Sequence, residues 1–177
     1  ETYVSGLLKA SGVRDNFVVI NPGARSHLKR WTQEGYADLA DRIAGESKAD
    51  IVFIGTKEDE VIVAGVMSRM KQKSHNFIGK TGVRQLGGLL KRSKLLITND
   101  SAPLHIGCAI GTKVLAIFGP TDPGKYGPTG EYDAVISKKL FCSPCEDPVC
   151  KSNYECMSMV SPADIYESAK MMIEGYE

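Results

Sequence analysis

Residues 95–106 read Leu-Leu-Ile-Thr-Asn-Asp-Ser-Ala-Pro-Leu-His-Ile, an apolar run followed directly by a small polar turn and a proline. The apolar run predicts a buried strand over 95–98. Asp100 or Ser101 can cap a helix that carries Pro103 in its first turn. A strand that passes straight into a helix is half of a β-α-β unit, so this stretch predicts an α/β fold with a parallel sheet.

The same alternation of apolar runs and amphipathic stretches extends over the rest of the chain. Solid apolar runs separated by helices are typical of strands buried on both faces of a parallel sheet. Right-handed crossovers then make a Rossmann-like doubly wound layer the expected architecture. The predicted strands are 17–20, 51–55, 76–78, 95–98, 114–118 and 134–136, and helices are predicted after a cap at Thr32, along Val63, Val66, Met67 and Met70, over 83–92, through Ala109 and after a cap at Ser161.

Length and composition describe one folded domain. The chain has 177 residues, 42% of them hydrophobic, and a net charge of +1, which excludes a disordered tail and argues against a nucleic-acid binder. No apolar run reaches the roughly 18 residues of a membrane-spanning helix. The first residues carry neither an initiator Met nor a signal-peptide pattern, so we expect that something upstream has been removed. Residues through Gly12 are expected to form a helix or a connector.

Three polar clusters follow predicted strands, where parallel sheets bind ligands. In the first, the helix start near Asp100 favours an anion by typically ~0.3–1 kcal/mol, and His105 lies one turn inside it. In the second, residues 118–128 read Phe-Gly-Pro-Thr-Asp-Pro-Gly-Lys-Tyr-Gly-Pro, a rigid turn. An ordinary N-cap with a surface histidine and a purely structural loop explain these residues equally well.

The third cluster, residues 21–31, reads Asn-Pro-Gly-Ala-Arg-Ser-His-Leu-Lys-Arg-Trp and supplies countercharge for a phosphorylated ligand, although a solvated basic loop is the alternative. The carboxylates of 58–60 suit sugar hydroxyls or simply the start of a helix. No G-x-G-x-x-G follows the first strand and no G-x-x-x-x-G-K-[ST] occurs, which argues against a dehydrogenase or a P-loop enzyme.

Four of the five cysteines lie within 15 residues, as Cys142-x2-Cys145-x4-Cys150-x5-Cys156. Four thiols this close suit structural zinc, free thiols or disulfides, and the sequence leaves all three open. Cys108 falls within a predicted helix and is interpreted as a small buried hydrophobe.

Several motifs together resemble glycosyltransferase family 9, the lipopolysaccharide heptosyltransferases. Residues 98–106 (TNDSAPLHI), 111–114 (GTKV) and 118–123 (FGPTDP) resemble the family's C-terminal signature. Residues 21–24 with 29–31 are similar to its other donor-side motif, and the segment ending in Cys156-Met157 is also similar to one common there. The resemblance covers nearly the whole chain, from about Phe17 to the last helix.

The resemblance implies the C-terminal half of a GT-B glycosyltransferase, which has two Rossmann-like domains facing across a cleft. Residues 1–16 would be a connector from an absent N-terminal domain, and residues 17–177 the nucleotide-sugar donor-binding domain. The complete enzyme would transfer heptose from ADP-heptose to a lipopolysaccharide core acceptor with inversion. The absent domain would hold the lipid-linked oligosaccharide acceptor and the general base, so no catalytic residue is assigned to this chain.

The resemblance also implies roles for individual residues. Lys29 would contact the donor phosphates, while an acidic residue of 58–60, here taken as Glu60, would meet the ribose or sugar. Lys29, His105 and the helix start would supply the positive charge, so no metal cofactor is required. Arg25 departs from the Ser or Thr frequent in the family and leaves that contact open. The cradle is assigned to Asp100, Ser101, Ala102 and His105, and Thr121 and Asp122 are expected to line the same pocket.

The sequence leaves two alternatives to the heptosyltransferase function open. One is a UDP-sugar-dependent GT-B transferase or an epimerase. The other is a non-catalytic binding module stapled by zinc at Cys142, Cys145, Cys150 and Cys156. The family resemblance places the protein in the cytoplasm, at most in peripheral contact with the inner face of the inner membrane.

Overall fold

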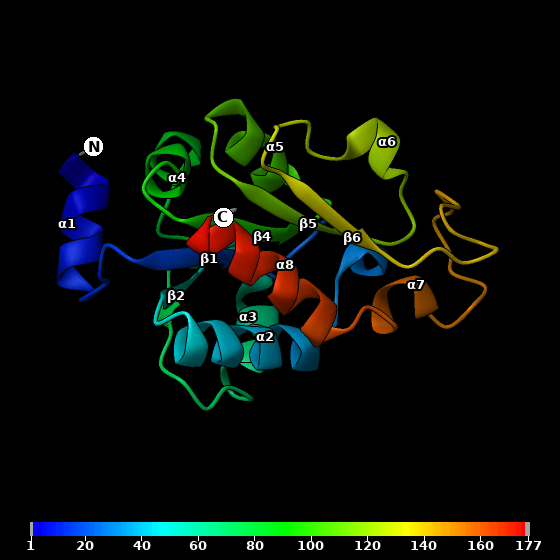
Figure 1. The fold of residues 1–177 in the computed structure, drawn as a ribbon, viewed down its shortest axis with the longest axis horizontal. Coiled ribbons are helices and arrows are strands. Elements are labelled where there is room, and N and C mark those ends of the chain that lie inside the picture. The colour runs from blue at the N-terminus through cyan, green and yellow to red at the C-terminus, as the bar shows by residue number, and fades with distance from the viewer. Residues whose placement is uncertain (1, 176–177) are drawn as a thin grey trace.

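A computed structural model describes residues 2–175 of the chain. Within that range, six strands form one parallel sheet in the order β3-β2-β1-β4-β5-β6 (Figure 1). All six predicted strands are confirmed, although β2 and β3 end two residues earlier than expected. The strands are β1 (Phe17–Asn21), β2 (Asp50–Phe53), β3 (His75–Asn76), β4 (Leu95–Asn99), β5 (Val114–Phe118) and β6 (Ala134–Ser137).

The strand order confirms the doubly wound, Rossmann-like layer. The chain builds outward from β1 to β3 and then returns to the other side of β1, where β4 pairs with it in the register Ile20↔Ile97 and Asn21↔Thr98. The direction of winding therefore reverses between β1 and β4. Open α/β sheets bind ligands at the carboxyl ends of the strands beside such a reversal.

Helices cover both faces of the sheet (Figure 1). Leu39, Val63 and Ile165 belong to the cluster on the face that presents Val18 and Ile20, so α2, α3 and α8 cover that face. The cluster on the other face includes residues of α1, α4 and α5. The helices are α1 (Thr2–Ala10), α2 (Gln33–Glu46), α3 (Glu60–Met67), α4 (Val83–Leu90), α5 (Ala102–Ala109), α6 (Pro123–Tyr126), α7 (Glu155–Ser158) and α8 (Pro162–Glu174), with short 3-10 turns at His27–Lys29 and Lys57–Asp59.

The predicted helix starts are largely confirmed. Thr32 accepts a hydrogen bond from the backbone N–H of Gly35, and Ser161 accepts one from Ala163. The helix predicted along Val63, Val66, Met67 and Met70 ends earlier than expected, since α3 ends at Met67 and Met70 lies beyond it. The start of α5 differs from the prediction, because neither Asp100 nor Ser101 caps it with a side chain.

The first residues form a helix that belongs to the fold. Val4 and Leu8 of α1 are buried in the same core as α4 and α5, and the Tyr3 hydroxyl donates to the carbonyl of Lys80 at 2.7 Å. The division into a connector over 1–16 and a donor-binding domain over 17–177 stays a prediction. Among residues 2–175, no helix combines the length and apolar character needed to cross a membrane.

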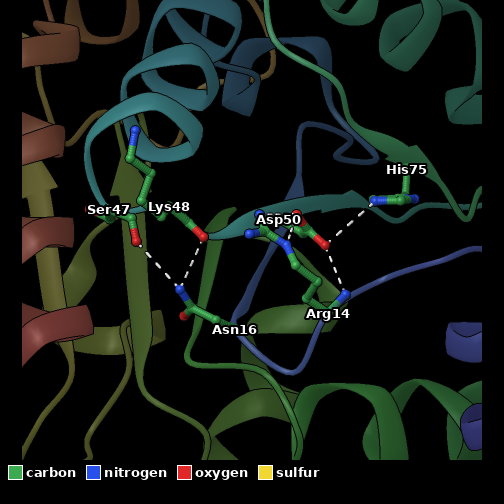
Figure 2. A network of polar contacts seen from close by, with 6 residues as sticks. All are labelled: Arg14, Asn16, Ser47, Lys48, Asp50 and His75. Carbon is green, nitrogen blue, oxygen red and sulfur yellow. Dashed lines mark hydrogen bonds and ion pairs between the residues drawn. The ribbon is translucent and has the colours of Figure 1, made fainter.

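A polar network ties the amino edge of the sheet together, as Figure 2 shows. The Arg14 guanidinium donates to Asp50 Oδ1 from Nε at 2.9 Å, and the Arg14 backbone N–H donates to Oδ2 at 2.8 Å. His75 Nε2 lies 3.9 Å from the same carboxylate. Asn16 donates to the carbonyls of Ser47 and Lys48. This network joins the segment before β1 to the starts of β2 and β3.

Candidate functional site

A pocket of about 1200 Å³ opens at the carboxyl edge of the sheet, beside the reversal between β1 and β4. We call it the switch-point pocket. Its walls come from the loop after β1, the loop after β2, the start of α4 and the start of α5. Lys29 and His105 both line it. The expected convergence of distant segments at one edge is therefore confirmed.

Lys29 reaches the pocket wall as half of an ion pair. Its Nζ lies 2.6 Å from Asp100 Oδ2, and the Thr121 hydroxyl donates to the same oxygen at 2.8 Å. The Asp100 side chain is only 8% exposed, whereas that of Lys29 is 30% exposed. The lysine charge is thus accessible from the pocket, while the Asp100 carboxylate is buried and held by the Thr121 hydroxyl.

Two buried asparagines position the loops around this ion pair. Asn99 Oδ1 accepts from the Trp31 backbone N–H at 3.1 Å and from the Tyr36 hydroxyl at 2.9 Å. Its amide donates to the carbonyl of Pro22 at 2.8 Å. Burial raises the pKa of Tyr36, which keeps that hydroxyl protonated as a donor. Asn99 therefore fixes the loop that carries Lys29 to the end of β4.

Asn21 performs the corresponding task at the end of β1. Its amide donates to the Ser101 hydroxyl at 2.9 Å and to the Thr98 hydroxyl at 3.1 Å. Sequence reasoning assigned no role to either asparagine. The available signal was an amide at the last position of an otherwise apolar strand, where a buried polar group needs partners.

The start of α5 faces the same pocket. Ser101 occupies the N-cap position, but its hydroxyl is engaged with Asn21 and Thr98 instead of the helix. Asp100 is likewise engaged by Lys29 and Thr121. The first turn of α5 therefore has no side-chain cap among the described residues, and its positive end adjoins Lys29. His105, one turn further on, is exposed and lines the pocket.

The acidic stretch after β2 contributes other residues than the one predicted. Glu58 and Asp59 line the switch-point pocket, whereas Glu60, taken as the ribose or sugar contact, is exposed as the first residue of α3 and is not among its lining residues. Asp59 Oδ2 accepts from the backbone N–H and hydroxyl of Thr56 at 2.9 and 3.0 Å. A Cβ at Gly23 would collide with the Asp59 carboxylate, so glycine is required where these two loops meet.

A second cavity of about 360 Å³ adjoins the pocket on the far side of Lys29, and we call it the side cavity. Thr121 lines this side cavity together with Lys29 and does not line the switch-point pocket. Asp122 lines neither cavity, because its side chain caps α6 by accepting from the Gly124 N–H at 2.8 Å. The side cavity is lined by Ser26, Leu28, Lys29, Pro120, Thr121, Tyr126, Glu146 and Asp147.

The remaining predicted groups divide between pocket and surface. Ser101 and Ala102 line the switch-point pocket, as do Arg25 and Arg30. The Arg30 Nε donates to the Ala24 carbonyl at 2.9 Å. Cys108 is half-buried instead of fully buried, and its sulfur lies 3.8 Å from Asp133 Oδ2.

The other four cysteines line one small cavity behind the side cavity. All are free thiols, and burial raises the pKa of the Cys156 thiol, an effect that the neighbouring thiols reinforce. Across residues 2–175, no group of three or more His, Cys, Asp or Glu side chains is arranged so that it could hold a metal ion. Structural zinc at Cys142, Cys145, Cys150 and Cys156 stays a prediction, which elemental analysis of the purified protein would test.

Comparison with known proteins identifies relatives of this arrangement. A model of glycosyltransferase family 9 (heptosyltransferase) matches residues 5–155. Lipooligosaccharide heptosyltransferase 2 of Campylobacter jejuni is 29% identical over 161 residues, which are 88% of this chain and 50% of that protein. The chain thus spans about half the length of the curated relatives it matches.

Solved structures agree with the sequence match. A family 9 glycosyl transferase from Veillonella parvula superimposes with a TM-score of 0.87 at 27% identity, over 98% of this chain and 52% of that one. ADP-heptose lps heptosyltransferase II of E. coli gives a TM-score of 0.82 at 20% identity, again over 98% and 52%, and shows the same fold. Because the family model matches most of the chain and a solved member of the family shares the architecture, this chain belongs to glycosyltransferase family 9, the heptosyltransferases.

Proposed function

We propose that this chain is the donor-binding, C-terminal half of an inverting glycosyltransferase that moves heptose from ADP-heptose to a lipopolysaccharide core acceptor. The observation that carries the proposal is the convergence of Lys29, His105 and the uncapped start of α5 on one pocket at the switch point. The family membership and the donor named for the E. coli structure support the choice of sugar nucleotide.

The diphosphate would lie against the start of α5. The helix end offers backbone N–H groups and a positive dipole, and Lys29, which adjoins that end, adds a full charge. His105 adds a further donor from the first turn. Lysine suits this task because its ammonium is a compact charge on a flexible stem. It can donate hydrogen bonds to Asp100 and to a phosphate oxygen at the same time.

The chemical step follows from this placement. The bond between the anomeric carbon and the diphosphate oxygen breaks as an acceptor hydroxyl attacks from the opposite face, and the nucleoside diphosphate leaves with the electron pair. Negative charge on the departing oxygen grows in the transition state, so Lys29 and the α5 N–H groups would bind it most tightly there. The hydroxyl proton would pass to a base in the other half of the enzyme.

The nucleoside would occupy the part of the pocket lined by the loop after β2 and the start of α4. Val83 and Leu86 offer an apolar surface there, and Glu58 offers a carboxylate for ribose hydroxyls. Glu58 is exposed and, as a glutamate, ionised at neutral pH, so its carboxylate can accept from ribose hydroxyls. We therefore assign the acidic contact to Glu58 in place of Glu60.

The partners follow from the same assignment. The lipid-linked oligosaccharide acceptor would be held by the other half of the enzyme and would meet this pocket across the cleft. Such an acceptor places the enzyme in the cytoplasm, in peripheral contact with the inner face of the inner membrane.

Calorimetric titration of the chain with ADP and with UDP tests the proposal. We expect ADP to bind more tightly than UDP, and Lys29→Ala to weaken ADP binding by about tenfold, the loss of roughly one charge-assisted contact. Lys138→Ala is the matched control, since Lys138 pairs with Asp164 on α8, outside the pocket. A preference for UDP would favour the UDP-sugar transferase or epimerase, and no nucleotide binding together with stoichiometric zinc would favour the binding module.

A further inference from the structure

The side cavity differs in charge from the pocket beside it. The switch-point pocket gathers Lys29, Arg25 and Arg30 with the positive end of α5. Three carboxylates also line it, but Asp100 is paired with Lys29 and Asp59 accepts from Thr56, which leaves Glu58 on the loop after β2. The side cavity is lined by the carboxylates of Glu146 and Asp147 and by the hydroxyls of Ser26 and Thr121. Carboxylates repel a phosphate but accept hydrogen bonds from hydroxyl groups. The two spaces are therefore suited to chemically different parts of one ligand.

The shared wall fixes the order of those parts. Ser26, Lys29 and Tyr126 line both spaces, so the side cavity adjoins the place proposed for the diphosphate. In a sugar nucleotide the diphosphate lies between the nucleoside and the sugar. With the diphosphate at Lys29 and the nucleoside toward Val83, the sugar would extend past Lys29 toward Thr121.

We propose that the side cavity receives the sugar of the donor, and that Glu146 and Asp147 select it by accepting hydrogen bonds from its hydroxyl groups. This inference rests on the proposed function. The volume of about 360 Å³ lies within the range of small-molecule pockets, about 300–1,000 Å³. Tyr126 and Pro120 add apolar faces against which a sugar ring can pack.

The acidic wall is held in place by the turn that carries Thr121. The backbone N–H groups of Cys145 and Glu146 both donate to the Pro120 carbonyl, at 3.0 and 2.9 Å. The Lys125 ammonium contacts Glu146 Oε1 at 3.0 Å. Glu146 has a φ of 55°, a left-handed conformation that few residues other than glycine adopt. These contacts hold the Glu146 backbone against the turn, and from there Glu146 lines the cavity.

The cysteine segment braces this turn from behind. A Cβ at Gly119 would collide with Met157 and Cys156, so the segment packs directly against the backbone of the turn. The Ser143 hydroxyl donates to the Gly119 carbonyl. A segment that is otherwise remote from the diphosphate site therefore forms one wall of the sugar site.

The test compares ADP with ADP-heptose on the same chain by calorimetry. Glu146→Gln and Asp147→Asn, singly and together, keep the shape of the wall and remove its charge. We expect the double variant to lower the ratio of ADP-heptose affinity to ADP affinity by about tenfold, as expected for losing strong acceptors. ADP affinity itself should be unchanged or slightly higher, because two negative charges near the phosphate are gone.

Glu167→Gln is the matched control, since Glu167 is an exposed carboxylate on α8 that lines neither space. A ratio that stays the same in the double variant, while ADP still binds, overturns the sugar assignment alone. Failure of the unmodified chain to bind ADP would overturn the proposed function instead. The two results are distinguished within one set of titrations.

Discussion

Two ion pairs at opposite edges of the sheet look alike and are built for different tasks. At the carboxyl edge, Lys29 makes a single contact with Asp100, whose carboxylate is also held by Thr121. At the amino edge, Arg14 holds Asp50 through its guanidinium and its own backbone N–H, with His75 nearby (Figure 2). Arg14 is held to Asp50 by several hydrogen bonds, whereas the Lys29 ammonium is a compact charge on a flexible stem that can turn toward a ligand.

The contrast extends to what surrounds each pair. The Lys29 pair forms part of a pocket wall, and the loops around it are held by buried amides. The Arg14 pair joins the segment before β1 to β2, and Arg14 is 63% exposed. The position of an ion pair relative to the strand ends therefore separates a ligand site from a structural contact, although both pairs join a basic side chain to an aspartate.

The largest expected effect comes from the amide that supports the carboxyl edge. Asn99→Leu removes the side-chain acceptor of the buried Trp31 N–H and leaves the Tyr36 hydroxyl only the more distant Asn21 carbonyl, at 3.5 Å. We therefore expect a loss of about 3 kcal/mol in unfolding free energy. Urea denaturation measures it. Asn16→Leu, at the amino edge, removes two longer and less buried bonds and should cost about 1 kcal/mol or less. Equal losses would contradict this division.

The next test replaces each of the two cations with alanine, in separate variants. Lys29→Ala should weaken ADP binding by about tenfold. It should also lower the unfolding midpoint, because it leaves the largely buried Asp100 carboxylate with only the Thr121 hydroxyl as a partner. Arg14→Ala should lower the unfolding midpoint and leave ADP affinity unchanged. Calorimetry and thermal unfolding on both variants measure the two properties. The comparison breaks if Arg14→Ala weakens ADP binding as much as Lys29→Ala does.

Acid titration sharpens the account of the amino edge. Partial burial raises the pKa of Asp50, but the hydrogen bonds and charge of Arg14 outweigh it, so the folded-state pKa is lowered. Asp50 therefore stabilises the fold above its ordinary pKa of about 4, and this contribution is lost as the pH falls through the lowered value.

Asp50→Asn should accordingly destabilise the protein at pH 7 and have a shrinking effect toward pH ~2.5. Urea denaturation at both pH values measures this difference. Asp15→Asn is the control, because Asp15 is fully exposed and lies 3.8 Å from Arg92. A pH-independent effect of Asp50→Asn would show that the carboxylate charge is not what stabilises this edge.

The smallest effect is expected for an ion pair that belongs to neither edge. Glu34 contacts Arg69 at 2.7 Å, but both side chains are largely exposed to solvent. Glu34→Gln should change the unfolding free energy by less than about 0.5 kcal/mol and leave ADP binding unchanged. Urea denaturation and calorimetry provide the measurement. A loss above about 1 kcal/mol would mean that exposed pairs stabilise this fold as strongly as the Arg14 network does.

Much of the fold was predictable because apolar runs and caps are local signals. The runs at 17–20 and 114–118 became β1 and β5 almost without change, and the caps at Thr32 and Ser161 make the expected bonds. Glu60, the predicted acidic contact, lies outside the pocket lining, and a 3-10 turn at Lys57–Asp59 precedes α3 there. Each residue turns the direction of a helical side chain by about 100°, so a shift of one or two positions moves a carboxylate off the pocket wall.

The sequence alone determined the elements of the sheet, the polar segments that follow its strands, and the family. Those properties depend on residues that are neighbours along the chain, or on motifs whose order along the chain is the signal. Only the tertiary structure decided that Asp100 pairs with Lys29 instead of capping α5, that Asn99 supports the loop after β1, and that Glu146 faces the side cavity. These contacts join residues many positions apart, and their partners depend on strand order and register, which bring separate loops to one edge.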